Sequence, residues 1–437
     1  MTDVPLVDML REETGRPAHP ETFLSSQRGK NGLAPVTVGV DFPVCVVLPA
    51  GGSGERTGLQ TPKQFCLLLG RPLISYTIQG FERVSWIHSI VVVVAKENMD
   101  LMTDIVGRFQ HTKVRLVAGG STRHRSICNG VMALAEEDEE QDRDNKVVII
   151  HDAVRPFVEE DFLYHITVAA REHGASGAIR PLVSTVIATT SEDFLDHSLE
   201  RAKYRASEMP QAFKLNIIHK AYQRCTEADF AFGTECLHLV LQYCATNAKL
   251  IEGPPTLWKV TYKRDLAAAE SVVKDKLSRS ACVITGACSR ARMLADSLHE
   301  AFCSLEMDLD IIPDVIGDNG RYLHKAWNFI QFFMNVSDLA QLETTFAAIQ
   351  AASQTLLHPV VVIVVSLSNA DRRAAEPAAF AELASTAKLR NILLYGVHVQ
   401  QSKDAERWAR SVAKVAELTS ALIRERSEAL VGQLLQA

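Results

Sequence analysis

Short apolar segments rich in β-branched residues alternate with helical patterns along most of this 437-residue chain. The segments are too uniformly apolar to have one solvated face, so helices must cover both faces of the sheet that they form. In the first series the strand segments are 44–48, 89–95, 113–118, 146–151 and 247–252, and the helical patterns are 74–84, 98–110, 123–136, 159–173, 235–244 and 263–277. This alternation predicts an α/β fold with a mostly parallel, doubly wound sheet.

A second series of strand and helix patterns follows the first and predicts a second Rossmann-like α/β domain. Its strands are predicted at 281–285, 308–312, 330–336, 359–367 and 391–399, and its helices at 289–303, 321–329, 338–353, 376–388 and 404–429. A chain of this length exceeds one ordinary domain, so we predict domains over 43–278 and 279–437. Residues 1–42 mix Pro, Gly, Ser and charges without periodicity, which predicts a flexible leader.

Two stretches interrupt the first series. The acidic tract "EEDEEQDRDN" at 136–145 is predicted to be a solvated loop. Between 181 and 213 the alternation lapses into a strand, a turn and further extended segments. Such a stretch predicts an arm that leaves the sheet, where it could cover a neighbouring site or pair with a second subunit.

The overall composition excludes two classes of protein. A net charge of −6 over this length argues against a nucleic-acid binder held by bulk electrostatics. The longest apolar run, 359–367, is far shorter than the ~20 residues that span a bilayer, and residues 1–22 lack the pattern of a secretory signal. The nine cysteines form no C-x-x-C pair, as is typical of reduced thiols. We therefore predict a cytosolic protein without a membrane span.

The stretch "VVLPAGGSGERTGLQTPKQF" at 46–65 predicts a phosphate-binding loop. Its strand ends in Ala50, Gly51, Gly52, Ser53 and Gly54, where glycine permits a tight turn with N–H groups close to a ligand. Neither the G-x-x-x-x-G-K-[ST] pattern nor the G-x-G-x-x-G pattern is complete here. Two cations, Arg56 and Lys63, follow the loop, and both side chains bind phosphate oxygens well.

A family resemblance makes this loop specific. "LPAGGSGERTG…TPKQF" is similar to the signature of nucleotidyltransferases that load a sugar or polyol phosphate onto a nucleotide. The later motifs are "AGGSTRHRSICNG", "HDAVRPFV", "LERAKYRASEMPQAF", "FGTECL" and "WKVTYKRDL". In this order, over about 44 to 277, they resemble the cytidylyltransferases that act on methylerythritol phosphate and ribitol phosphate. The resemblance implies that a polyol phosphate attacks the α-phosphorus of CTP and expels pyrophosphate.

The same resemblance implies roles for individual residues. Implied for catalysis and charge stabilisation are Arg56, Lys63, Lys259 and Asp152. Implied to hold CTP are Ala50, Gly51, Gly52, Ser53, Gly54, Gly119, Gly120 and Ser126. Implied to bind the acceptor are Asp152, Arg155, Arg201 and Thr234. A carboxylate beside three phosphates needs an intervening cation, so we expect Mg²⁺ as cofactor, with Asp152 either binding it through water or contacting the polyol hydroxyls.

Two departures from the family pattern bear on the acceptor. The family's usual Thr-Pro-Gln is Met209-Pro210-Gln211 here, and "HDAVRPF" at 151–157 is closer to the ribitol branch than to the methylerythritol branch. Ribitol 5-phosphate is therefore the expected acceptor and CDP-ribitol the expected product, which the resemblance implies is a donor for glycans such as those of dystroglycan. Methylerythritol 4-phosphate or another pentose or pentitol phosphate stays open, as does a scaffold that binds CTP without turnover. A homodimer through the arm is expected.

The second half carries a dinucleotide-like loop, "VITGACSRARMLADSL" at 283–298. It resembles the T-G-x-x-x-G-x-G of short-chain dehydrogenases, but Arg290 and Arg292 stand at the two later glycines and would obstruct a pyrophosphate. The catalytic Tyr-x-x-x-Lys is missing too, because Lys325 follows Tyr322 one residue too soon. We therefore expect no catalysis by this domain, and a role in dimerisation, stability or docking; a dehydrogenase remains the alternative.

Overall fold

The fold is described from a computed structural model of the chain. It describes residues 39–437 except 53–57, 59–60, 138, 234, 287–288, 325, 334–338, 353–357, 369–376, 401 and 403. Most of the predicted leader, residues 1–38, lies outside the described residues.

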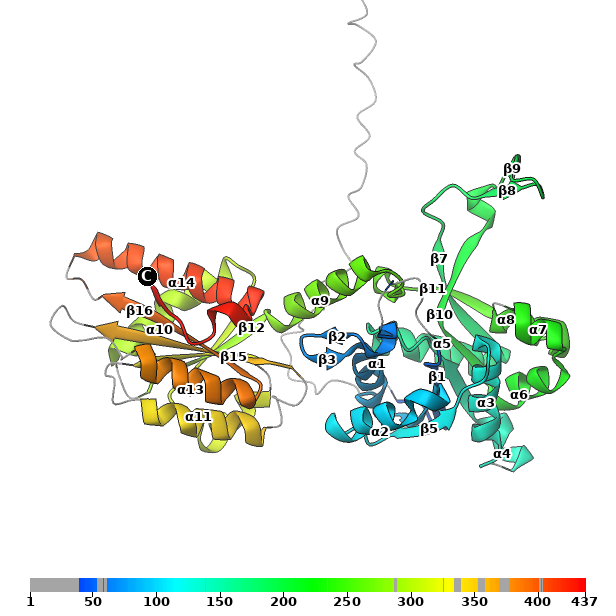
Figure 1. The fold of residues 1–437 in the computed structure, drawn as a ribbon, viewed down its shortest axis with the longest axis horizontal. Helices are drawn as coiled ribbons and strands as arrows, with labels where there is room; N and C mark the ends of the chain where they lie inside the picture. Colours follow the sequence, from blue (N-terminus) through cyan, green and yellow to red (C-terminus); the bar gives the residue numbers. More distant parts are fainter. Residues whose placement is uncertain are drawn as a thin grey trace, which may run out of the picture. The chain divides into compact units, whose positions relative to one another are not determined.

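A seven-stranded sheet forms the framework of the first α/β region (Figure 1). Its strands are β1 (Val44–Pro49), β4 (Ile87–Val94), β5 (Val114–Ala118), β6 (Val147–Ile150), β7 (Ala175–Pro181), β10 (Arg205–Lys214) and β11 (Lys249–Glu252), in the order β11-β7-β10-β6-β1-β4-β5. Among these strands β10 alone is antiparallel to its neighbours, so the predicted mostly parallel sheet is confirmed.

Helices cover both faces of this sheet. The helices of the first region are α1 (Leu73–Glu82), α2 (Met99–Arg108), α3 (Arg123–Ala135), α4 (Glu140–Asn145), α5 (Glu160–His173), α6 (Leu215–Arg224), α7 (Glu227–Phe232), α8 (Cys236–Cys244) and α9 (Lys263–Leu277). Val44, Val46 and Leu48 of β1 share a core with α1, α2 and α5. Cys45 and Val47 share a second core with α3, α6 and α8. This two-sided burial explains why β1 is apolar at every position rather than at every second one.

The two interruptions differ from their predictions. Part of the acidic tract, predicted to be a loop, forms the short helix α4. The arm is shorter than predicted, because residues 205–213 belong to the main sheet as β10. Its tip is an antiparallel pair, β8 (Ile187–Thr189) and β9 (Leu195–Ser198), which extends beyond the paired ends of β7 and β10 (Figure 1).

The strand order creates a crevice at one point of the sheet. From β1 the chain moves outward through β4 to β5, and it then returns to place β6 on the other side of β1. The segments that follow β1 and β6 therefore diverge at the carboxyl ends of two adjacent parallel strands. Open α/β sheets bind ligands at such switch points.

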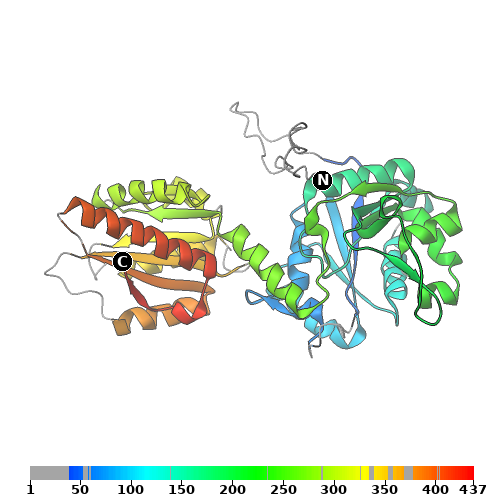
Figure 2. The ribbon, with the colours of Figure 1, turned by 90° about the horizontal axis from the view of Figure 1, so that it is seen from above.

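The second α/β region has a fully parallel sheet of six strands. They are β12 (Ser280–Ile284), β13 (Asp308–Ile312), β14 (Asn328–Phe333), β15 (Val360–Ser368), β16 (Ile392–Gln400) and β17 (Leu434–Gln436), in the order β13-β12-β14-β15-β16-β17. One core contains α10 (Ser289–Cys303) and α14 (Ala405–Glu425), and the other contains α11 (Leu339–Ala351) and α13 (Pro377–Leu389). Figure 2 shows these layers from above.

The second doubly wound fold is thus confirmed, with three differences. The predicted helix at 321–329 is wrong, because a 3₁₀ segment covers Gly317–His324 and β14 begins at Asn328. The short strand β17 was not predicted. The order follows the flavodoxin-like pattern, extended by one strand, rather than the 3-2-1-4-5-6 pattern of dinucleotide-binding domains.

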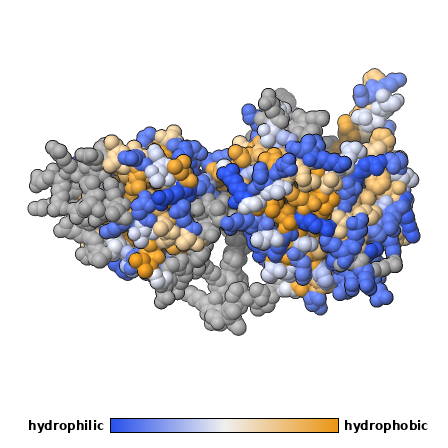
Figure 3. Space-filling model, turned by 60° about the horizontal axis from the view of Figure 1, so that its bottom comes forward, coloured by the Kyte–Doolittle hydropathy of each residue, from blue (hydrophilic) through white to orange (hydrophobic). Residues whose placement is uncertain are grey.

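The length and the apolar content of the helices bear on the prediction that no segment spans a membrane. No helix in the described part of the chain is both long enough and apolar enough to cross a bilayer. The face in Figure 3 is largely hydrophilic, with separate hydrophobic areas between the polar side chains.

Candidate active site

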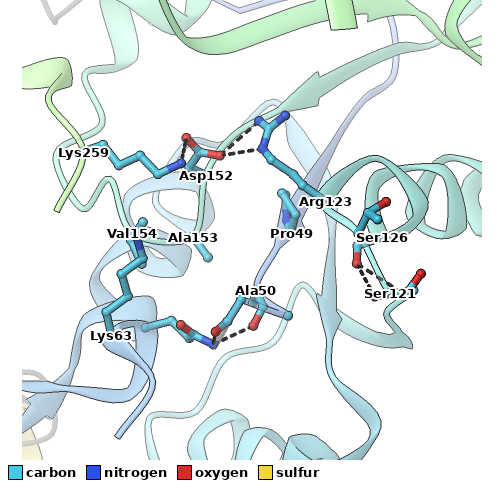
Figure 4. A pocket seen from close by; sticks show the side chains of 15 residues that line it. Pro49, Ala50, Lys63, Ser121, Arg123, Ser126, Asp152, Ala153, Val154 and Lys259 are labelled. Atoms are coloured by element: carbon cyan, nitrogen blue, oxygen red, sulfur yellow. Dashed lines mark hydrogen bonds and ion pairs between the residues drawn. The ribbon is translucent and has the colours of Figure 1, made fainter. Parts of the chain in front are cut away.

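A cavity of about 670 Å³ opens at the switch point between β1 and β6 (Figure 4). Its size falls in the range of small-molecule sites. It is lined by Pro49, Ala50, Gly51, Gly52, Lys63, Gln64, Gly120, Ser121, Thr122, Arg123, Ser126, Asp152, Ala153, Val154 and Lys259. These residues come from the loop after β1, the loop after β5, the loop after β6 and the turn before α9, so the sheet brings four distant segments together.

The first wall is the glycine-rich segment after β1. The Ala50 N–H donates to the Val93 carbonyl at 2.7 Å, which fixes the start of the loop against β4. The Gln64 side chain donates to the Ala50 and Gly52 carbonyls from across the cavity wall. Lys63 lies beside Gln64 in a buried 3₁₀ turn, Lys63–Phe65. The wall therefore joins the peptide loop and a cation.

The second wall is the loop after β5, which leads into α3. Thr122 caps that helix by accepting a hydrogen bond from the Arg125 N–H, and Ser126 Oγ accepts from the Gly120 N–H at 3.1 Å. A Cβ on Gly120 would lie 2.4 Å from the Arg125 Cβ, so this position requires glycine. The amino end of a helix favours an anion, and α3 begins at the cavity wall.

Asp152 lies after β6 and is contacted by three cations. Arg123 donates to Oδ1 through Nη2 at 3.1 Å, and Oδ2 accepts from Arg155 Nε at 3.0 Å and Lys259 Nζ at 3.1 Å (Figure 4). Burial alone would raise the pKa of this carboxyl, but the charges of Arg123, Lys259 and Arg155 hold it well below its usual range. Asp152 is therefore an anion at any physiological pH and gathers positive charge at the cavity.

Comparison with known proteins places this arrangement in a family. Residues 44–275 match the family model described as 2-C-methyl-D-erythritol 4-phosphate cytidylyltransferase, and residues 279–416 match that of the D-ribitol-5-phosphate cytidylyltransferase C-terminal domain. The curated D-ribitol-5-phosphate cytidylyltransferase of Homo sapiens is 45% identical over 97% of this chain and 98% of its own length. The chain belongs to the D-ribitol-5-phosphate cytidylyltransferase family.

Some relatives cover nearly the whole chain, and others cover about half of it. The D-ribitol-5-phosphate cytidylyltransferase of Xenopus tropicalis is 47% identical over 90% of this chain and 97% of its own. The 2-C-methyl-D-erythritol 4-phosphate cytidylyltransferase of Syntrophus aciditrophicus (strain SB) is 34% identical over 54% of this chain and 98% of its own. A solved 4-diphosphocytidyl-2C-methyl-D-erythritol synthase from Anaerococcus prevotii DSM 20548 covers 53% of this chain and 99% of its own, at 22% identity and a TM-score of 0.44.

Most of the residues that the sequence implied for this family's site lie around the cavity. Lining it are Ala50, Gly51, Gly52, Lys63, Gly120, Ser126, Asp152 and Lys259. Gly119 is not in the lining, but a Cβ there would lie 3.1 Å from Ser126 Oγ, so it packs closely against a lining residue. Ser53, Gly54, Arg56 and Thr234 lie outside the described residues. The implied roles of these residues remain predictions, because the geometry fixes their place and not their function.

Two implied acceptor-binding residues lie away from the cavity. Arg155 is buried, and besides Asp152 it donates to the Glu208 carboxylate and the Leu257 carbonyl, so it joins the site to β10 and to the turn before Lys259. Arg201 is exposed on the arm, where it donates to the Val183 carbonyl at 2.9 Å. Within one chain, Arg155 therefore contacts Asp152 without lining the cavity, and Arg201 does not line the cavity either.

Four polar residues that line the cavity were not singled out by the sequence analysis, namely Gln64, Ser121, Thr122 and Arg123. Arg123 donates to Asp152 through two nitrogens, and Gln64 holds the first loop. Both lay inside motifs that were quoted, "AGGSTRHRS" and "TPKQF". Arg123 stands where a helix starts after a glycine loop, which is the available signal for an anion-facing side chain.

The fit of the expected Mg²⁺ can be tested on these contacts. The two oxygens of Asp152 already accept from three cationic side chains, an arrangement that does not suit direct coordination of a metal ion. In the described part of the chain no group of three or more His, Cys, Asp or Glu side chains could hold a metal. A direct protein site for Mg²⁺ does not fit these residues.

Proposed function

We propose that this chain converts CTP and D-ribitol 5-phosphate to CDP-ribitol and pyrophosphate. The observation that carries the proposal is the cavity at the switch point, which Lys63, Arg123 and Lys259 line together with the glycine-rich loop. Membership of the family supports the same reaction, since the vertebrate relatives carry that name. The cavity is large enough for a nucleotide.

The chemistry requires the site to bring two polyanions together. An oxygen of the ribitol phosphate forms a bond to the α-phosphorus of CTP, while the bond from that phosphorus to the bridging oxygen breaks and pyrophosphate leaves. Cations that are already in place stabilise the charge that moves to the leaving group, and losing one such donor costs on the order of 10²–10³ in turnover. Lys63 and Lys259 are the candidates among the described cations that line the cavity.

Asp152 supports this reaction by holding cations in place. Its carboxylate fixes Lys259 and Arg123 in separate directions around the cavity rim (Figure 4). We propose that Mg²⁺ enters as part of the substrate, bound to the triphosphate, which is how Mg²⁺ is commonly carried into nucleotide sites.

We further propose that two chains pair through the arm. The arm exposes apolar side chains: Val183 is 88%, Phe194 67%, Leu195 64% and Ile187 49% exposed. Apolar groups concentrated on one projecting element favour burial against a partner. Arg201 does not line the cavity of its own chain. We propose that pairing brings it within reach of the site of the second chain.

We propose a cytosolic location. The described cysteines are all free thiols, which fits a reducing compartment. No membrane-crossing helix is present among the described residues either.

The test is pyrophosphate release by the purified protein with CTP and Mg²⁺. Ribitol 5-phosphate, methylerythritol 4-phosphate and ribose 5-phosphate are offered in parallel, and Lys63→Ala is compared with Lys249→Ala, a change at an exposed lysine of β11. We expect ribitol 5-phosphate to give the fastest release, with a loss of about 10²–10³ in Lys63→Ala and none in Lys249→Ala.

Two results would contradict the proposal. Faster release with methylerythritol 4-phosphate would reassign the acceptor. Binding of CTP without release for any acceptor would indicate a CTP-binding scaffold.

A further inference from the structure

The Gln64 side chain crosses from one segment of the candidate site to another. Gln64 is 2% exposed and follows Lys63 in the 3₁₀ turn Lys63–Phe65. Its Nε2 donates to the Ala50 carbonyl at 2.8 Å and to the Gly52 carbonyl at 3.0 Å. One buried carboxamide therefore holds both ends of a three-residue stretch of the glycine-rich loop.

The chemistry of the amide fixes its orientation. A carboxamide nitrogen carries two N–H donors, and here each meets a backbone acceptor. The flipped orientation would place the amide oxygen against two carbonyl oxygens, so the network itself assigns the nitrogen to this position. A glutamate has the same shape but would bring negative charge to the two carbonyls, so no acidic side chain can replace this contact at neutral pH.

The contact also links the loop to a cation. Lys63 and Gln64 share one turn, which Phe65 anchors in the hydrophobic core. Ala50 is fixed from the other side, because its N–H donates to the Val93 carbonyl. The positions of Lys63 and of the loop backbone are therefore set relative to each other before any ligand arrives. Such preorganisation lowers the cost of ordering a site on binding.

We propose that Gln64 is a positioning residue for the triphosphate of CTP. It acts through the backbone of Ala50 to Gly52 and through the placement of Lys63. The inference rests on the proposed function in that it takes CTP as the ligand of this cavity. It assigns Gln64 no contact with the reacting atoms.

The test replaces the amide by a carboxylate in the full-length protein. Gln64→Glu is compared with Gln433→Glu. Gln433 lies in the second α/β region, and its Nε2 makes the same kind of bond to the Ala429 carbonyl at 2.8 Å. We expect CTP affinity, measured by calorimetry without acceptor, to fall at least about tenfold in Gln64→Glu and to stay unchanged in Gln433→Glu. Lowering the pH should restore part of the affinity relative to wild type, because a protonated carboxyl can donate again.

A second readout does not depend on activity. Hydrogen exchange of the peptide that covers residues 44–52 should become faster in ligand-free Gln64→Glu. Gln64→Met has similar length but no donor and no charge. It should also show weaker CTP binding and faster exchange, and it replaces Gln64→Glu in the test if the carboxylate variant does not fold. The KM for ribitol 5-phosphate should change less than the KM for CTP in either variant.

The proposal is overturned if the folded variants bind CTP within about twofold of wild type, whether or not exchange of residues 44–52 changes. It is also overturned if CTP affinity falls while exchange of that peptide is unaltered. Failure of the proposed function looks different. In that case wild type binds CTP but releases no pyrophosphate with ribitol 5-phosphate, and the comparison of CTP affinities still tests Gln64.

Discussion

Arg123 donates to one oxygen of Asp152 through two nitrogens, Nε at 3.3 Å and Nη2 at 3.1 Å. Arg123 begins α3 and Asp152 follows β6, so this contact joins the loop after β5 to the loop after β6. The third nitrogen of Arg123, Nη1, is buried and meets no acceptor among the described residues. The pair holds two walls of the cavity in a fixed relation.

A double-mutant cycle tests this coupling. Arg123→Lys keeps the charge but loses the planar fork, and Asp152→Asn keeps the shape but loses the charge. We expect each to lower kcat/KM by about 10- to 100-fold, and the double variant to be little worse than the weaker single variant, with a coupling of about 1–3 kcal/mol. Additive losses would show that the two residues act separately.

The two glycines that line opposite walls should respond differently to alanine. A Cβ on Gly52 would meet no atom of the described residues within 4 Å, whereas one on Gly120 would overlap Arg125. We therefore expect Gly120→Ala to lower the thermal midpoint. Gly52→Ala should leave the midpoint unchanged but weaken CTP binding, because its methyl group takes up ligand space. Calorimetry and thermal unfolding of both variants separate the two effects. Unchanged CTP binding in Gly52→Ala would contradict a role of the glycine-rich loop in binding CTP.

The sequence predicted the uniformly apolar strands, but it missed β7, whose first four residues are small and buried. The apolar run at 44–48 predicted β1, and the structure confirms this strand at Val44–Pro49. Its side chains are buried in two cores, one on each face of the sheet. The extended segments that form β10 were predicted as part of the arm rather than of the sheet, because the first half of the strand is polar, with Arg205 and Ser207 exposed and paired only with β7. The side chains there are polar because they are exposed to solvent, and the segment is a strand because its backbone pairs with β7.

Residues of the candidate site could be predicted from the sequence only where they belong to a local motif. Glycines after a strand and nearby cations pointed to Gly51, Gly52 and Lys63. The role of Arg123 depends on Asp152, which is 29 residues away, and that of Gln64 depends on carbonyls 12 and 14 residues earlier. Contacts of this kind are set by tertiary packing, and no spacing rule in the sequence announces them.

Two buried histidines should make stability depend on pH. Burial lowers the pKa of His124 to about 4, with a further contribution from Arg123, and burial lowers the pKa of His151 to about 4. An unfolded histidine has a pKa near 6.5. Between these values the unfolded chain binds protons that the folded chain does not, so stability is full above about pH 6.5 and falls as the pH drops toward about 4.

Urea unfolding at a series of pH values measures this effect. Each histidine contributes a slope of at most about 1.4 kcal/mol per pH unit in that window. His124→Asn should reduce the slope by one such share, while His299→Asn, at an exposed histidine of α10, should leave it unchanged. An unaltered slope in His124→Asn would contradict a neutral buried His124.

The arm makes a prediction about mass in solution. If two chains pair through β8 and β9, light scattering should give twice the chain mass of 48.2 kDa for wild type. Leu195→Asp should shift it to the mass of one chain, because a charge at a buried apolar contact is costly. Leu389→Asp, a change at a 90% exposed leucine at the end of α13, is the matched control. A wild-type mass of one chain would dismiss pairing, and a dimer that survives Leu195→Asp would move the interface elsewhere.

The central claim is that this cavity forms a phosphorus–oxygen–phosphorus bond between CMP and ribitol 5-phosphate. Phosphorus NMR of the reaction of CTP, Mg²⁺ and ribitol 5-phosphate observes that bond directly. We expect a pair of mutually coupled diphosphate-diester signals that grow together with pyrophosphate and are absent in Lys63→Ala. Loss of CTP to CDP and inorganic phosphate, with the ribitol 5-phosphate signal unchanged, would contradict it.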